Sequence, residues 1–310
     1  MWEDVGVHLP RMKGDDPTTW TPLTEEEADR LKAARPEGGG DPYFGGSGHR
    51  FFIRNGAEAR SLNLAPRALW RVAEQLLGEG TVVSPAGLDK DGMATGPSFM
   101  SDEAVSGLAT HLGNDMGLPP EGTNKTETVS FPPTGPVWQN GQGTRGIYAT
   151  LPNSPSNLPD YKSAHSDGGW YGRYRLQMAA YIDDVPANCG GFTVWPGSHT
   201  RIWKEQWDAF RAGHTHISKH PDGRKPGYTD PAILEIKRNE DPVDCHGPAG
   251  SVVLWHTKIL HIAGQNASED VLRQAVIYGF LKTAESLTDG LVIDNTDGDI
   301  WRDWSEEVRG

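Results

Sequence analysis

Apolar residues recur at helical spacing in three stretches of the first 113 residues. One stretch opens with Thr24 and Glu27 in capping-box spacing. Another has Pro66 at a first helical position and Gly78 where a C-cap is expected. The pattern predicts three surface helices, each covering one face of a neighbouring element. They are residues 23–34, 64–80 and 101–113.

The spacing of apolar residues changes to that of β-strands from about residue 145. Short runs rich in β-branched and aromatic residues lie between turn formers. The predicted strands are residues 145–151, 175–183, 191–195, 251–256 and 274–281. A helix over residues 201–210 and a polar connection over 213–231 interrupt them. We expect a mainly β single domain, residues 1–310, with a helical N-terminal part, about 1–140, packed on a jelly-roll (cupin-like) core, about 145–285.

Composition narrows the class of protein. A hydrophobic content of 36% with 11 Trp indicates a folded chain, and 38 Gly with 23 Pro favour a β-rich one. A net charge of −13 argues against binding to nucleic-acid phosphates. Two cysteines are too few for a disulfide scaffold. Neither a leader nor an apolar run of about 20 residues is evident. We therefore expect a cytoplasmic protein that contacts no membrane; its oligomeric state is left open.

Two His-x-Asp pairs occur, and a chain with 11 His would contain about one by chance. His220 and Asp222 lie in the turn-rich sequence KHPDGRKPG, which predicts a solvated loop. His165 and Asp167 precede two glycines, and in an extended segment both side chains would point to one face. The pair His165 and Asp167 is therefore the candidate for metal binding.

A third ligand is needed, and His256 and His261 are the candidates. We favour His261 because Arg273 follows it by twelve residues, at the start of the last predicted strand. Two His and one carboxylate on one face of an iron form the facial triad of non-haem Fe(II) oxygenases. Arg offers the fork that grips the far carboxylate of a chelating co-substrate. The other interpretation is a core His261, with Arg273 at the barrel edge paired to Glu269 or Asp270.

Four short motifs follow one another along the second half of the chain. They are HSD at 165–167, CGGFTVWPGSH at 189–199, GSVVLWHTKILHIAGQN at 250–266 and RQAVIYGF at 273–280. Together they resemble the phytanoyl-CoA dioxygenase (PhyH) family of Fe(II)/2-oxoglutarate-dependent oxygenases, over about residues 145–281. The chain departs from the family at Ala263, where many members carry Ser, and the interval from the distal His to Arg273 is one residue longer.

The resemblance implies a double-stranded β-helix with helices against one face. It also implies Fe(II), 2-oxoglutarate and O2 as cofactor and co-substrates. The implied iron ligands are His165, Asp167 and His261, and Arg273 would anchor the far carboxylate of 2-oxoglutarate; these four are the candidate catalytic residues. Further polar contacts to the co-substrate are expected from Tyr148, Gln177 and Thr193, which lie on strands near the site. Trp170 is a candidate for the substrate pocket.

The implied reaction oxidises a small-molecule substrate, by default through hydroxylation, and converts 2-oxoglutarate to succinate and CO2. Desaturation and cyclisation stay open. Two other classes of function are a non-catalytic jelly-roll protein that binds a metal or small acid, and a cupin-type hydrolase or isomerase. Arg273 favours the oxygenase, because neither alternative needs a carboxylate clamp there. The substrate is not indicated: Lys162, Arg173 and Arg175 would attract an anion or be solvated charges.

Overall fold

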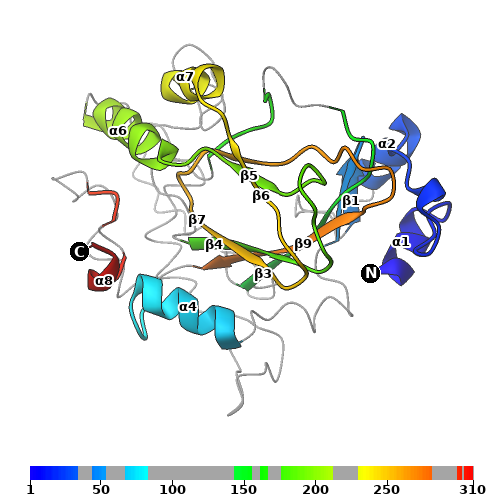
Figure 1. The fold of residues 1–310 in the computed structure, drawn as a ribbon, viewed down its shortest axis with the longest axis horizontal. Helices are drawn as coiled ribbons and strands as arrows, with labels where there is room; N and C mark the ends of the chain where they lie inside the picture. Colours follow the sequence, from blue (N-terminus) through cyan, green and yellow to red (C-terminus); the bar gives the residue numbers. More distant parts are fainter. Residues whose placement is uncertain are drawn as a thin grey trace, which may run out of the picture.

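Two antiparallel β-sheets form the centre of the computed structural model (Figure 1). The structure describes residues 1–33, 44–53, 67–82, 143–155, 161–166, 176–211, 230–280, 299–301 and 304–309. The larger sheet has the strand order β1-β2-β3-β9-β4-β7. Its strands are β1 (Phe44–Ser47), β2 (Arg50–Ile53), β3 (Gly143–Thr150), β4 (Leu176–Tyr181), β7 (Val252–His256) and β9 (Arg273–Phe280).

The smaller sheet has the order β6-β5-β8. Its strands are β5 (Phe192–Val194), β6 (Val243–Cys245) and β8 (His261–Ala263). The chain passes from one sheet to the other between β4 and β5, between β6 and β7, and on both sides of β8. This alternation is that of a double-stranded β-helix, and the expected mainly β jelly-roll fold is confirmed.

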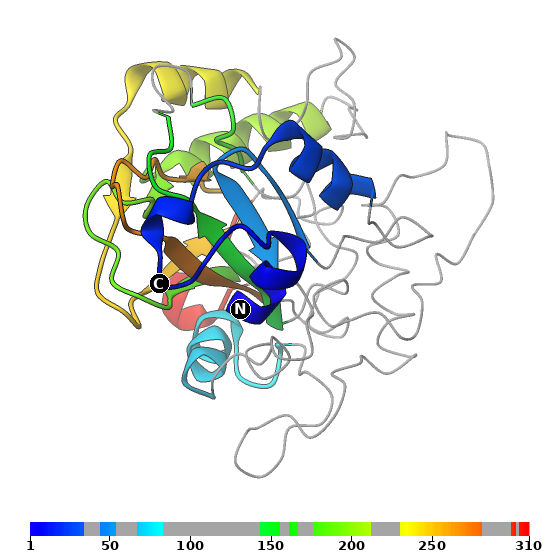
Figure 2. The same ribbon diagram turned by 90° about the vertical axis from the view of Figure 1, so that its right-hand side faces the viewer.

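Helices cover the outside of both sheets (Figures 1 and 2). They are α1 (Trp2–His8), the 3-10 turn η1 (Pro17–Thr19), α2 (Glu25–Ala33), α4 (Arg67–Leu77), α6 (Ser198–Arg211), α7 (Pro231–Asn239) and α8 (Glu306–Arg309). Helix α4 packs with Met178, Val276 and Tyr278 on the outer face of the larger sheet. Helices α6 and α7 bury Ile202, Ile233 and Ile236 behind the smaller sheet. Within the described residues, no helix combines the length and apolarity needed to span a membrane.

The sequence signals at two helix ends correspond to real contacts. The Thr24 hydroxyl accepts from the backbone N–H of Glu27 at 3.1 Å, and the Glu27 carboxylate accepts from that of Thr24 at 2.9 Å. This is the expected capping box. Helix α4 ends before Gly78, whose φ of +108° suits a glycine. The helix expected at 101–113 lies outside the described residues, as does nearly all of the polar connection at 213–231.

The N-terminal part also contains strands that the sequence analysis did not predict. The hairpin β1–β2 pairs through β2 with β3, with Arg50 opposite Thr150 and Phe52 opposite Tyr148. It therefore widens the larger sheet beyond the jelly-roll core, and α1 and α2 cover it (Figure 2). The N-terminal part, expected to be helical, thus also contributes a β-hairpin at residues 44–53.

Candidate active site

His165 and His261 face the same side of the smaller sheet. The backbone N–H of His165 donates to the carbonyl of His261 at 3.0 Å, and the reverse bond measures 2.9 Å. Residues that exchange both bonds are directly opposite each other in an antiparallel pair, so their side chains project together. The two ring centroids lie 4.6 Å apart. The segment that carries His165 thus extends the smaller sheet beyond β8.

Each of these imidazoles is oriented by a backbone carbonyl. Nδ1 of His165 lies 2.8 Å from the carbonyl oxygen of Ser163, and Nδ1 of His261 lies 2.9 Å from that of Ile259. A carbonyl oxygen only accepts, so both Nδ1 atoms carry the proton. In the neutral rings the lone pair is then on Nε2, as in a histidine that binds a metal through Nε2 while its Nδ1–H donates to a carbonyl. The donor set fits a metal such as iron.

The third expected ligand, Asp167, lies outside the described residues, as does Trp170. The described residues alone hold no group of three His, Cys, Asp or Glu that could bind a metal ion. His256, the other candidate for the distal histidine, lies away from His165. It stacks on Trp304 at 5.5 Å and accepts from the backbone N–H of Lys258. The structure therefore brings together His165 and His261, and Asp167 remains a prediction.

Arg273 begins β9 and is 4% exposed. Its Nε donates to the carbonyl of Gly190 at 2.6 Å, and one terminal nitrogen donates to that of Tyr148 at 3.0 Å. Burial away from water lowers the pKa of its guanidinium to about 10; Tyr181 opposes this shift and the charge of Arg50 adds to it. Neither Glu269 nor Asp270 pairs with Arg273 in the described part of the chain.

Two residues around Arg273 fix its position. Gly190 has φ +87°, and a Cβ there would lie 3.2 Å from Cβ of Arg273 and 3.3 Å from Cβ of Asn266. Asn266 is fully buried and donates to the carbonyls of Thr150 and Val271 at 3.1 and 2.7 Å. It thereby ties the connection between β8 and β9 to the end of β3. Both residues occur in the sequence pieces quoted above, but spacing alone did not reveal these roles.

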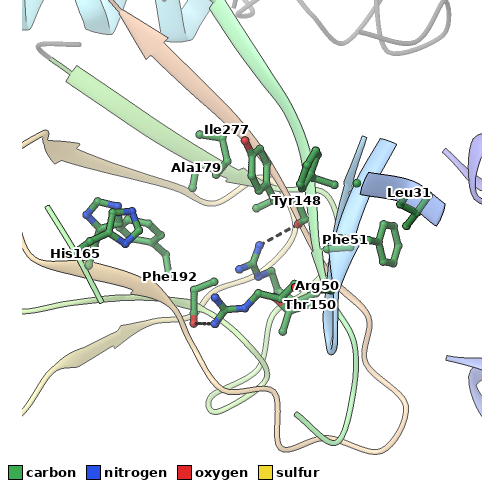
Figure 3. A pocket seen from close by; sticks show the side chains of 18 of the residues that line it. Leu31, Arg50, Phe51, Tyr148, Thr150, His165, Ala179, Phe192 and Ile277 are labelled. Atoms are coloured by element: carbon green, nitrogen blue, oxygen red, sulfur yellow. Dashed lines mark hydrogen bonds between the residues drawn. The ribbon is translucent and has the colours of Figure 1, made fainter. Parts of the chain in front are cut away.

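A cavity of about 730 Å³ lies between the two sheets. Figure 3 shows His165 and Phe192 on one side of it and Arg50, Tyr148 and Thr150 on the other. Arg273 and His261 line the same cavity. The sequence analysis missed Arg50, which comes from β2.

The expected polar contacts divide into two groups. Tyr148 and Gln177 line the cavity. Thr193 does not, because its neighbour Phe192 faces the cavity and successive strand residues alternate. The Thr193 hydroxyl instead donates to the carbonyl of Gly191 at 3.2 Å. Of the cations that flank His165, Lys162 is described and exposed, whereas Arg173 and Arg175 lie outside the described residues.

Comparisons with known proteins found one family model and several solved structures. Residues 144–275 match the family model Phytanoyl-CoA dioxygenase (PhyH). The non-heme alpha ketoglutarate dependent carbocyclase SnoK from nogalamycin biosynthesis is 15% identical, with 83% of each chain covered and a TM-score of 0.30. EctD from S. alaskensis, solved with 2-oxoglutarate and 5-hydroxyectoine, is 14% identical over 86% of this chain and 78% of its own, with a TM-score of 0.26.

Other matches are partial. EvdMO1 is 18% identical, with a TM-score of 0.29, over 44% of this chain and 27% of its own. The match to the epimerase SnoN likewise spans only 48% of that chain. No curated protein matches.

Residues 144–275 therefore match the model of a family of Fe(II)/2-oxoglutarate-dependent oxygenases, and their strands form a double-stranded β-helix. The resemblance to the phytanoyl-CoA dioxygenase family is thereby confirmed for residues 144–275. Fe(II), 2-oxoglutarate and O2 are the cofactor and co-substrates of this class.

Proposed function

We propose that the protein hydroxylates a small molecule at the cavity between its two sheets, with conversion of 2-oxoglutarate to succinate and CO2. The observation that carries the proposal is the pair His165 and His261, which face one another across a hydrogen-bonded bridge with both Nδ1 atoms tied to carbonyls. A buried cation, Arg273, lines the same cavity.

Each residue has a distinct role in this proposal. His165 and His261 hold Fe(II) through Nε2, and Asp167 supplies the carboxylate ligand. When bound, Fe(II) supplies the activation of O2 and the oxidative decarboxylation of 2-oxoglutarate. Arg273 binds the distal carboxylate of 2-oxoglutarate and so orients its 2-oxo acid end towards the histidines. The protein thus positions the metal and 2-oxoglutarate, and Arg273 supplies the positive charge that binds the distal carboxylate.

The cavity walls near His261 are apolar. The ring centroids of Phe192 and Trp255 lie 5.1 and 5.6 Å from that of His261. In the proposed reaction, apolar walls of this kind would pack against the substrate and hold one of its C–H bonds near the metal. The cavity volume is that of ordinary small-molecule pockets. A cytoplasmic location and a single-domain organisation stay predictions of the sequence.

The test is an anaerobic titration of the metal-free protein with Fe(II) and 2-oxoglutarate, followed by the weak visible band of the chelate. We expect the band in wild type, its loss in His165→Ala and His261→Ala, and a shift to higher 2-oxoglutarate concentration in Arg273→Ala. His256→Ala is the matched control, because this histidine lies beside Trp304 and does not line the cavity.

Succinate formation from 2-oxoglutarate in air would complete the test. A chelate band without succinate, over a broad set of small molecules, would support a binding protein instead. Iron binding of equal strength in wild type and both histidine variants would contradict the proposal.

A further inference from the structure

Arg50 and Arg273 belong to one row of residues across three strands. Arg50 on β2 is paired with Thr150 on β3, and Thr150 is paired with Arg273 on β9. Directly paired residues project from the same face of a sheet, and all three line the cavity. Neighbouring strands lie about 4.8 Å apart, so the two arginine Cα atoms are about 10 Å apart, with Thr150 midway between them.

Both guanidinium groups bind backbone carbonyls and have N–H groups to spare. Arg50 donates one hydrogen bond, to the carbonyl of Ala263 at 2.6 Å. Arg273 donates two, to Gly190 and Tyr148. A guanidinium has five N–H donors, so most of those on Arg50 and several on Arg273 remain for a ligand. Among the described residues, neither arginine forms an ion pair with a carboxylate.

Thr150, between the two arginines, also has unused hydrogen-bonding capacity. Thr150 is 1% exposed, and its hydroxyl has no hydrogen-bond partner within the described part of the chain. A buried hydroxyl without a partner costs free energy, and native structures rarely keep one. Its place between two cations indicates that an acceptor binds there.

The positive charges of Arg50 and Arg273 also favour the binding of an anion between them. Burial lowers the pKa of Arg50, and the charge of Arg50 contributes to the low pKa of Arg273. Asp29, on α2, is the one acidic side chain among the described residues that line the cavity, and it is exposed. Two neighbouring like charges, one buried and one partly buried, disfavour the folded state until an anion joins them.

We propose that Arg50, Thr150 and Arg273 form one carboxylate-binding site, in which the distal carboxylate of 2-oxoglutarate receives hydrogen bonds from both guanidinium groups and from the threonine hydroxyl. This inference rests on the proposed function. A carboxylate has about four lone-pair sites, which is enough for two guanidinium groups and a hydroxyl. The site explains why a second, partly buried cation, Arg50, lines the cavity beside Arg273, which the single clamp at Arg273 does not.

Two substitutions and two ligands test the site. Arg50→Gln and Thr150→Val are each titrated anaerobically, in the Fe(II)-loaded protein, with 2-oxoglutarate and with 2-oxobutyrate, which lacks the distal carboxylate. The readout is the dissociation constant, taken from the chelate band and from calorimetry. Arg201→Gln is the matched control, since Arg201 pairs with Glu235 and Glu240 at α7, away from the cavity.

We expect 2-oxoglutarate to bind about tenfold or more weakly to Arg50→Gln, and about threefold to tenfold more weakly to Thr150→Val. Binding of 2-oxobutyrate should not change in either variant. Thr150→Val should also keep or raise the thermal stability of the ligand-free protein, because it removes a buried hydroxyl that lacks a partner.

Three results would overturn the inference. Equal weakening of both 2-oxo acids would mean that Arg50 only supports the cavity wall through Ala263. Unchanged binding of 2-oxoglutarate, with the Arg273→Ala effect intact, would leave the proposed function standing and remove Arg50 and Thr150 from the site. Failure of the Fe(II)-loaded wild-type protein to bind either acid would overturn the proposed function itself, and this inference with it.

Discussion

At the scale of single residues, Gly190 shows how closely the backbone approaches the arginine. Its φ is +87°, and a Cβ would come within 3.5 Å of Cβ atoms of Arg273, Asn266 and Thr150. Gly190→Ala is therefore expected to lower the free energy of unfolding by about 1–3 kcal/mol and to weaken 2-oxoglutarate binding. Gly250→Ala is the control, with φ +81° and nothing within 4 Å of the added Cβ. Equal losses in thermal unfolding would show that backbone strain alone is responsible.

Arg273 gives a prediction about pH. Burial lowers its pKa to about 10, below the ordinary value of 12.5. The folded protein therefore binds fewer protons than the unfolded chain between these values, and the contribution of this group to stability rises with pH there. Carboxylate binding requires the charged form. We expect 2-oxoglutarate affinity to be flat near neutral pH and to fall as pH rises through about 10, by calorimetry with the metal-free protein.

The control for this titration is the Arg273→Ala variant, whose weaker binding of 2-oxoglutarate should not change as pH rises through about 10. Circular dichroism at each pH would show that the protein remains folded. A fall in 2-oxoglutarate affinity centred well below pH 9 would assign the effect to another group.

At the scale of elements, the connection between β8 and β9 determines where Arg273 begins its strand. Asn266 donates to two carbonyls and accepts from Ser268, through its backbone N–H at 3.3 Å and its hydroxyl at 2.5 Å. Asn266→Ala leaves the carbonyls of Thr150 and Val271 without this donor. We expect a loss of about 2–3 kcal/mol in unfolding free energy and a larger effect on the KM for 2-oxoglutarate than on kcat.

Ser268→Ala is the comparison, because it removes the hydroxyl bonds to Asn266 and to the backbone of Val271 but leaves both donor bonds of the Asn266 side chain in place. It should cost less stability and leave the KM nearly unchanged. A kcat effect in Asn266→Ala that exceeded the KM effect would argue against a positioning role.

How well the sequence predicts each site residue depends on the length and the apolar pattern of the element that carries it. The pairing of His165 with His261, rather than with His256, could be predicted because the sequence pieces that carry these residues follow one another in a fixed order along the chain. Thr193 could not be placed, since β5 has three residues and alternation alone does not say which of them faces the cavity. Arg50 was missed because its hairpin has four-residue strands, one of them FGGS, which show no apolar period. Its partner β3 begins about 90 residues later along the chain.

At the scale of the whole molecule, the two sheets are joined at the cavity by Tyr181. Its hydroxyl, on β4, donates to the carbonyl of Cys245 on β6 and accepts from the backbone N–H of Phe192 on β5 at 2.8 Å. Burial raises the pKa of this phenol, so it stays neutral and keeps its proton for the bond to Cys245. The hydrogen bonds of Tyr181 that join the two sheets at the cavity are therefore distinct from the apolar contacts that pack α4 on the outer face of the larger sheet.

This separation predicts that stability and ligand binding can be changed independently. Leu77 on α4 is fully buried against the outer face of the larger sheet, whereas the cavity lies on the inner face. Leu77→Ala should lower the free energy of unfolding by about 2–5 kcal/mol. Below its melting transition it should bind Fe(II) and 2-oxoglutarate as wild type does. Leu254→Ala removes the same side chain at a position that is 41% exposed and should alter neither property. Weaker 2-oxoglutarate binding by folded Leu77→Ala would instead mean that packing of α4 is transmitted through β9 to Arg273.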